Sequence, residues 1–206
     1  MVVYIWWGAE RILANIVNNL DPDKYDIEIL EYLHSDKHIE PINSNVKLLK
    51  PIIDETRKDV FSKLKKRIIN EYAIMHCPSV VRKLFLNRFY DIEVSFNYMI
   101  PTFLLDRRSS LLISWIHGSI ENLKCDDESR NIQRAYLGKT NEIVTISKKT
   151  QDSVIDVYPE FQSKTIKIYN GYNFEEMFHL ENDYKVDQFD LLYCNRLDDN
   201  KNPIFF

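Results

Sequence analysis

The sequence is poor in cysteine and has no long apolar run. Its three cysteines, Cys77, Cys125 and Cys194, are odd in number and form no CxxC pair. This pattern disfavours a disulfide framework or a zinc site and favours a reducing compartment. No apolar stretch approaches the length of a bilayer span, and the N-terminus has no basic segment leading into a long apolar one. We therefore expect a cytoplasmic protein that is neither secreted nor integral to a membrane.

Other familiar patterns are also missing. The GxGxxG fingerprint does not follow the first expected strand, which argues against a redox enzyme of the dinucleotide-binding class. There is no internal repeat and no low-complexity segment. His34 and His38 are four residues apart but flank an expected turn, so we interpret them as loop residues and not as metal ligands. At 206 residues, one full core plus a fragment of a second fits the length best.

The formal net charge of -4 hides an uneven distribution. Residues 57–88 carry nine cations against two acidic residues, a balance of +7, which leaves -11 for the rest of the chain. Apolar residues recur among the cations at helical spacing and predict a basic amphipathic helix; they are Val60, Phe61, Leu64 and Ile68. Its apolar stripe either faces the core or leans on an anionic membrane surface. Nucleic acid is not expected as a partner, because no aromatic-basic recognition motif accompanies the cations.

Strand and helix patterns alternate along most of the chain. Strands are expected at 1–5, 25–33, 45–53, 91–96, 111–117, 142–147, 165–169 and 189–194. Helices are expected at 12–20, 60–68, 79–89 and 126–137, and from Ser147 until Pro159. This alternation predicts an α/β fold, a Rossmann-like parallel sheet with helices on both faces. The strand at 165–169 is expected to end at Asn170-Gly171, a turn pair that tolerates positive φ.

Two places in this pattern can carry chemistry. The turn at Gly8 joins a strand to the start of a helix, where backbone amides and the helix dipole can collect a phosphate. His117 ends the most apolar strand, and ligand clefts of parallel sheets lie beyond the carboxyl ends of the strands. An imidazole there can orient a hydroxyl or relay a proton near neutral pH. The alternative is a structural histidine that only satisfies a hydrogen bond.

Five segments in order resemble family 4 glycosyltransferases of the GT-B fold. They are Gly8-Ala9-Glu10-Arg11, Trp115-Ile116-His117-Gly118, the strand ending at Ser147, Tyr169-Asn170-Gly171, and Arg196-Leu197 with Lys201-Asn202. The chain departs from the family pattern at Trp7 and Asn195, where the family usually has glycine. The resemblance implies the N-terminal, acceptor-side domain at 1–171, a linker at 172–188, and the start of a truncated nucleotide-sugar-binding domain at 189–206.

The resemblance also implies an activity and a site. The full enzyme is expected to move a hexosyl group, with retention, from a nucleotide-diphosphate sugar to a glycan or lipid-linked hydroxyl acceptor, without metal or other cofactor. His117 is then catalytic, and Gly8, Arg196 and Lys201 bind the donor phosphates. Residues expected to line the acceptor cleft are Trp7, Glu10, Gly118, Ser119 and Ser147. Ser147 alternatively serves only as a helix N-cap.

The family's paired glutamates would lie beyond Phe206, so the chain alone is expected to be inactive. Two other functions stay open. One is a non-catalytic acceptor-binding subunit that pairs with a donor-binding chain. The other is a GT-B-like nucleotide-sugar epimerase, because fold alone does not choose among activities.

Overall fold

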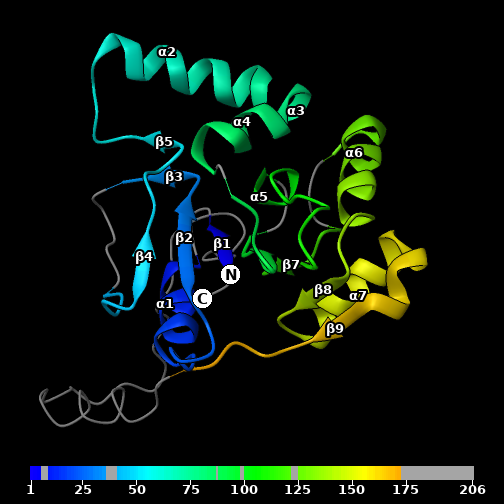
Figure 1. Ribbon diagram of the computed structural model, residues 1–206. Coiled ribbons are helices and arrows are strands. Elements are labelled where there is room, and N and C mark those ends of the chain that lie inside the picture. Colours follow the sequence, from blue (N-terminus) through cyan, green and yellow to red (C-terminus); the bar gives the residue numbers. More distant parts are fainter. Residues whose placement is uncertain (6–8, 36–40, 87, 98–99, 122–124, 173–206) are drawn as a thin grey trace, which may run out of the picture. The chain divides into compact units, whose positions relative to one another are not determined.

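Seven parallel strands form the central sheet of the computed structural model, in the order β4-β2-β1-β6-β7-β8-β9 (Figure 1). The strands are β1 (Val2–Ile5), β2 (Ile27–Glu31), β4 (Val46–Leu48), β6 (Ile92–Ser95), β7 (Leu111–Ile116), β8 (Glu142–Thr145) and β9 (Thr165–Lys167). The structure describes residues 1–172 except 6–8, 36–40, 87, 98–99 and 122–124. The truncated domain at 189–206 and all but the first residue of the linker at 172–188 lie outside the described residues.

The strand order is that of a doubly wound sheet. The chain first builds outward from β1 through β2 to β4, then returns to β6 beside β1 and builds the other way to β9. Connections therefore reverse direction between β1 and β6, and ligands of such sheets bind at this point. The predicted Rossmann-like parallel sheet is confirmed.

Helices cover both faces, as predicted. On β7, Ile113 and Trp115 point to one face and pack in the apolar cluster of α1 (Glu10–Asn18). Leu112 and Ile116 point to the other face, because side chains alternate along a strand. That second face is covered by α4 (Pro78–Phe85), α5 (Ile100–Phe103), α6 (Asp127–Leu137) and α7 (Lys148–Val157). The 3₁₀ helix η2 (Pro159–Lys164) leads from α7 into β9.

Two expected strands are each divided in the structure. The segment at 25–33 gives β2 and the start of β3 (Leu33–His34), and the segment at 45–53 gives β4 and the start of β5 (Ile53–Asp54). β3 and β5 pair with each other in a separate parallel sheet. Pro51 lies at the division of the second segment and has no N–H for a ladder bond. His34 thus lies in a short strand and not in a loop, with Nδ1 2.5 Å from a Glu31 carboxylate oxygen.

The basic segment begins with the predicted helix, α2, whose apolar stripe does not face the core. α2 (Val60–Ile68) continues through the π-helical η1 (Ile69–Ala73) into α3 (Ile74–His76), and the Asp59 side chain caps it by accepting a hydrogen bond from the Ser62 N–H at 2.9 Å. No residue of α2 is buried. The expectation that its apolar stripe packs on the core is therefore wrong. Periodicity identifies an apolar stripe but does not say which surface covers it.

Two buried carboxylates, Glu28 and Glu93, form ion pairs with cations of this basic segment. The sequence did not indicate that they are buried. Glu28 lies 2.8 Å from Arg88 and 2.8 Å from Lys47. Glu93 accepts hydrogen bonds from Arg82 at 2.5 Å and from the Ser109 hydroxyl at 2.7 Å. Buried charges need such partners. Arg82 and Arg88 thus have structural roles at the sheet.

Candidate functional site

The carboxyl edge of the sheet, beside the reversal point between β1 and β6, is the candidate site. β6 ends at Ser95 and is followed by Phe96, and β7 ends at Ile116 and is followed by His117. Strands β6 and β7 pair directly, with Ser95 opposite Ser114. Ala9 and Phe96 belong to one buried cluster, against which Trp115 packs. The start of α1 and the ends of β6 and β7 therefore meet here.

His117 lies against two aromatic side chains. Its ring centroid is 4.8 Å from that of Phe96 and 6.3 Å from that of Trp115, and it is nearly parallel to the indole at 13°. Phe96 and Trp115 contact each other at 5.0 Å. These rings hold the imidazole in place and keep water from much of its surface.

This environment keeps the imidazole neutral. Burial lowers the pKa of His117 to about 4, and a hydrogen bond with the Phe96 backbone only partly opposes this. Because that bond raises the pKa, the ring is its donor. Nε2 is buried and has no hydrogen-bond partner among the described residues, so the donor is Nδ1. Nε2 is then left as a hydrogen-bond acceptor.

The loop after His117 is fixed to α7. The hydroxyl of Ser153 accepts hydrogen bonds from the N–H of Ile120 at 2.8 Å and of Glu121 at 3.1 Å. The Arg130 guanidinium donates to the Ile120 carbonyl at 2.9 Å. Ser153 is almost fully buried. Sequence reasoning missed Ser153, because a serine inside a helix has no local pattern that points to a loop more than thirty residues away.

Two of the predicted cleft residues follow His117 directly. Ser119 is partly exposed and Gly118 is exposed. Gly118 does not adopt positive φ, and a side chain there would meet open space within 4 Å. Its backbone therefore does not require glycine. Gly171 likewise does not adopt positive φ, and β9 ends earlier than predicted, at Lys167.

Glu10 and Ser147 lie at helix starts on the same edge. Glu10 is in the first turn of α1, where an acidic side chain suits the helix dipole. Ser147 caps α7, its hydroxyl accepting a hydrogen bond from the Thr150 N–H at 3.1 Å. The capping role predicted for Ser147 is thus confirmed. Because Ile116 is opposite Thr145 in the β7–β8 ladder, His117 and Ser147 leave neighbouring strands close to the same level.

The remaining predicted site residues cannot be placed. Trp7, Gly8, Arg196 and Lys201 lie outside the described residues. In the described part of the chain, no group of three or more His, Cys, Asp or Glu side chains is arranged to hold a metal ion. Among the same residues, no helix is both long and apolar enough to cross a membrane.

Asn170 follows β9, at the position where the family resemblance places the interdomain crossing. Its Oδ1 is buried and lacks a hydrogen-bond partner within the described ranges, as does Nε1 of Trp115. A buried polar atom without a partner is costly. These atoms and Nε2 of His117 therefore give the structure three polar positions able to receive a ligand or another part of the chain.

Comparisons with known proteins find structural likeness only. No protein-family model and no curated protein matches the sequence. Similar solved structures include HepE from Anabaena in complex with UDP and glucose, 11% identical over 84% of this chain and 45% of that chain, with a TM-score of 0.48. HepE in complex with UDP-glucose is 11% identical over 84% and 44%, also with a TM-score of 0.48. This chain spans less than half of the length of HepE, and TM-scores of this size carry no argument about function.

Proposed function

We propose that this chain is the acceptor-side half of a GT-B glycosyltransferase of family 4. The full protein would transfer a hexosyl group from a nucleotide-diphosphate sugar to a glycan or lipid-linked hydroxyl, with retention and without a metal. The observation that carries the proposal is His117 at the carboxyl edge of a doubly wound sheet, a neutral imidazole whose buried Nε2 has no hydrogen-bond partner among the described residues. The ordered set of motifs from Gly8 to Lys201 supports it.

The pKa of His117 narrows its role. A base with a pKa of about 4 abstracts protons poorly near neutral pH, where an efficient general base has a pKa close to 7. It remains a good hydrogen-bond acceptor. We therefore assign His117 to holding a sugar hydroxyl through Nε2, with Ser119 and Glu10 as further hydroxyl-binding groups. Gly8, Arg196 and Lys201 are assigned to the donor phosphates, for which paired cations are suited.

Ligand binding to the 206-residue chain tests this assignment. NMR spectra of the His117 ring and the Trp115 indole are recorded during titration with UDP-glucose and, separately, with glucose. At least one of the two ligands should shift both signals. His117→Ala should weaken that binding about fivefold, the value of one hydrogen bond, whereas the exposed His76→Ala should not. If neither ligand disturbs the His117 ring, this site is wrong.

Transfer is measured separately from binding. We propose that turnover needs a donor-binding half in addition to this chain, so the 206-residue chain with UDP-glucose and an acceptor should release no UDP. Turnover by this chain alone, at a rate typical of enzymes, would contradict the proposal that transfer needs a further donor-binding half. In that case, the turnover rate of His117→Ala would test the role of His117 directly.

A further inference from the structure

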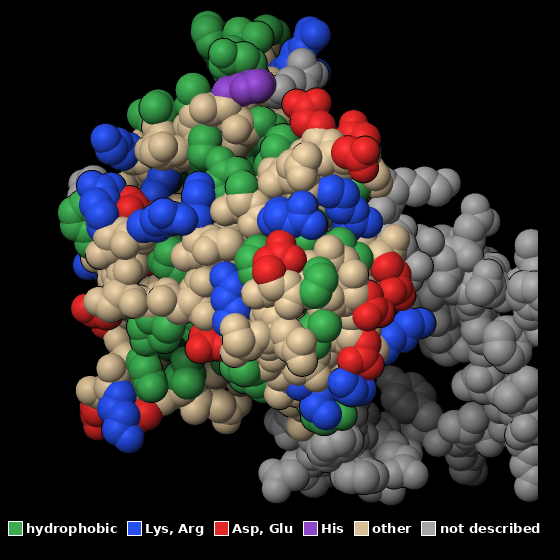
Figure 2. Space-filling view, turned by 90° about the vertical axis from the view of Figure 1, so that its right-hand side faces the viewer, with side chains coloured by type: hydrophobic (Ala, Val, Ile, Leu, Met, Phe, Trp, Pro, Cys, Tyr) green, Lys and Arg blue, Asp and Glu red, His purple; other side chains and the backbone are tan. Residues whose placement is uncertain are grey.

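An apolar groove lies between α2 and α4, away from the candidate site. Its volume is about 780 Å³, within the range of small-molecule pockets. Five of its apolar side chains are more than half exposed: Phe61, Leu64 and Ile68 from α2, and Val80 and Leu84 from α4. In Figure 2, hydrophobic side chains emerge at the top, where α2 and α3 lie, with Lys or Arg side chains beside them. Soluble proteins rarely expose a contiguous apolar surface of this kind, and where they do it is often a binding site.

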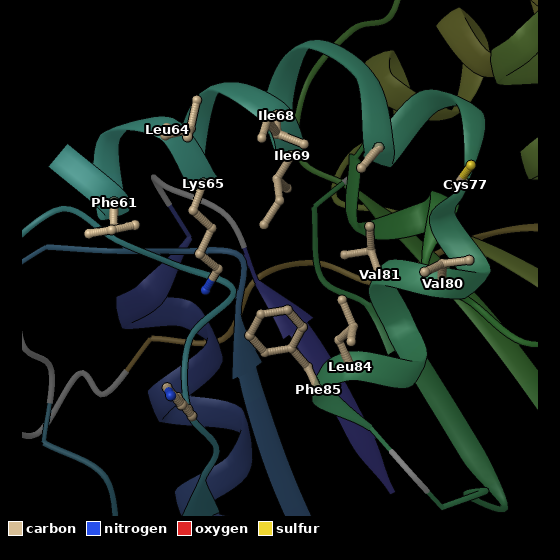
Figure 3. Close-up of a pocket in the computed structure, with 12 residues that line it drawn as sticks. Phe61, Leu64, Lys65, Ile68, Ile69, Cys77, Val80, Val81, Leu84 and Phe85 are labelled. Atoms are coloured by element: carbon tan, nitrogen blue, oxygen red, sulfur yellow. The ribbon is translucent and has the colours of Figure 1, made fainter.

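The groove is lined from both helices. Figure 3 shows Lys65 and Ile69 pointing across it toward Val81 and Phe85. The Lys65 ammonium lies 4.8 Å from the centre of the Phe85 ring. A chain-like apolar ligand lying between the helices would therefore contact apolar carbon on both sides and one cation.

A smaller polar hollow adjoins the groove. Its volume is about 450 Å³, and it shares Lys50 and Lys65 with the groove. Arg57 and Lys66 also line it, but Arg57 pairs with Asp54, another lining residue, and Lys66 pairs with Glu55. Burial first, and then repulsion from Lys50 and Arg57, lower the pKa of Lys65. Neither Lys50 nor Lys65 forms an ion pair with any residue that the structure describes, so this cluster would be stabilised by an anion.

We propose that this pair of hollows binds an anionic lipid of a bilayer surface. The acyl chain lies in the groove between α2 and α4, and the lipid phosphate lies against Lys50 and Lys65. An apolar site beside Lys50 and Lys65, two cations that form no ion pair with the described residues, is complementary to a molecule with one anionic end and one long apolar end. A second copy of the chain is a poor occupant, because it would bring Lys50 and Lys65 of both copies close together. The inference does not rest on the proposed sugar transfer.

Flotation with lipid vesicles tests the proposal on the 206-residue chain. Vesicles are made of phosphatidylcholine alone or with added phosphatidylglycerol, whose phosphate is not balanced by a headgroup cation and which therefore gives the surface a net negative charge. The chain should float with the anionic vesicles and remain largely unbound with the neutral ones. Lys65→Gln should weaken binding to the anionic vesicles about fivefold, the usual contribution of one cation near such a surface. Lys24→Gln makes the same charge change at a distant exposed turn and should leave binding unchanged.

A second pair of variants tests the groove. Leu64→Asp should weaken vesicle binding about tenfold or more, because it places a charge where the acyl chain would lie. Leu48→Asp is the matched control, since Leu48 is 57% exposed, Leu64 is 53% exposed, and Leu48 does not line the groove. Neither change touches a buried position, so both variants should fold. Equal binding by both variants, or equal binding to neutral and anionic vesicles, overturns the proposal.

Insertion of the acyl chain can be measured directly. In Phe61→Trp, the added tryptophan lies in the groove, and its fluorescence is taken as the difference from the unsubstituted chain. Lipids with brominated acyl chains should quench this added signal. Vesicle binding without quenching would mean that only surface charge attracts the chain and that the groove is not occupied. If the chain is instead a dimer that Leu64→Asp dissociates, the groove serves self-association and the lipid proposal is wrong.

Discussion

The guanidinium of Arg82, on α4, lies 2.5 Å from a carboxylate oxygen of Glu93, on β6, and both side chains are almost completely buried. The carboxylate also accepts hydrogen bonds from the Ser109 hydroxyl and from the Asp106 N–H at 3.1 Å. This pair fixes α4 to the sheet and so sets one wall of the groove. Both charged groups lie in a low-dielectric environment, where burying either charge without the other would cost free energy.

Removing one member of this pair should destabilise the fold strongly. Arg82→Met leaves the Glu93 carboxylate buried without its cation, and we expect the free energy of unfolding to fall by about 3–5 kcal/mol. Urea denaturation followed by circular dichroism measures the change. The surface pair Lys148–Asp152, with a separation of 2.6 Å, is the control. Lys148→Met should change stability by less than about 1 kcal/mol, and an equal loss in both variants would show that burial is not the cause.

Ser153→Ala should loosen the loop that follows His117. The substitution leaves the N–H groups of Ile120 and Glu121 without their acceptor, at a cost of about 1–3 kcal/mol. Hydrogen exchange of these two amides should therefore accelerate more than exchange elsewhere in the sheet. Ser163→Ala, at an exposed position, is the control. Unchanged exchange at Ile120 and Glu121 would mean that Ser153 does not position the loop.

The cap at Ser147 can be separated from a role in the cleft. Ser147→Ala should lower the free energy of unfolding by about 1 kcal/mol, and Ser147→Asp should keep most of it, because aspartate also caps helices well. Thermal denaturation of both variants measures this difference. Ser79, near the start of α4 but not at its cap, provides the control Ser79→Ala. If Ser147→Asp keeps stability but weakens glucose binding, Ser147 has both roles.

Local patterns predicted the sheet and its chemically useful edge. The predicted strand at 111–117 corresponds to β7, and the one at 142–147 corresponds to β8. Both could be predicted because a parallel strand that is buried on both faces has a short apolar run as its sequence. His117 was placed at a carboxyl end on the same basis. The neutral state of its ring was not predicted, since it depends on Phe96, a neighbour twenty-one residues away in the chain.

Long-range pairing explains what the sequence did not show. Nothing near Arg82 marks it as buried, because its partner Glu93 is on another element. The amphipathic pattern at Val60 and Phe61 fits a core-facing helix as well as an exposed one, and only the packing shows that both residues are exposed. Sequence patterns therefore identified the helices and strands, whereas tertiary contacts determine which face of each element is buried and which is exposed.

His117 should make stability depend on pH. Its pKa is about 4 in the folded chain, against an ordinary value of 6.5, so the unfolded chain binds the proton more tightly. Stability is then unaffected by this group above pH 6.5 and falls as the pH is lowered from 6.5 toward 4. The full loss is up to about 3 kcal/mol. Urea denaturation at several pH values should show a steeper loss for the parent chain than for His117→Gln, while His76→Gln should follow the parent. Parallel curves for the parent and His117→Gln would show that the imidazole is not desolvated by Phe96 and Trp115, and the assignment of Nε2 as a neutral acceptor would fail with it.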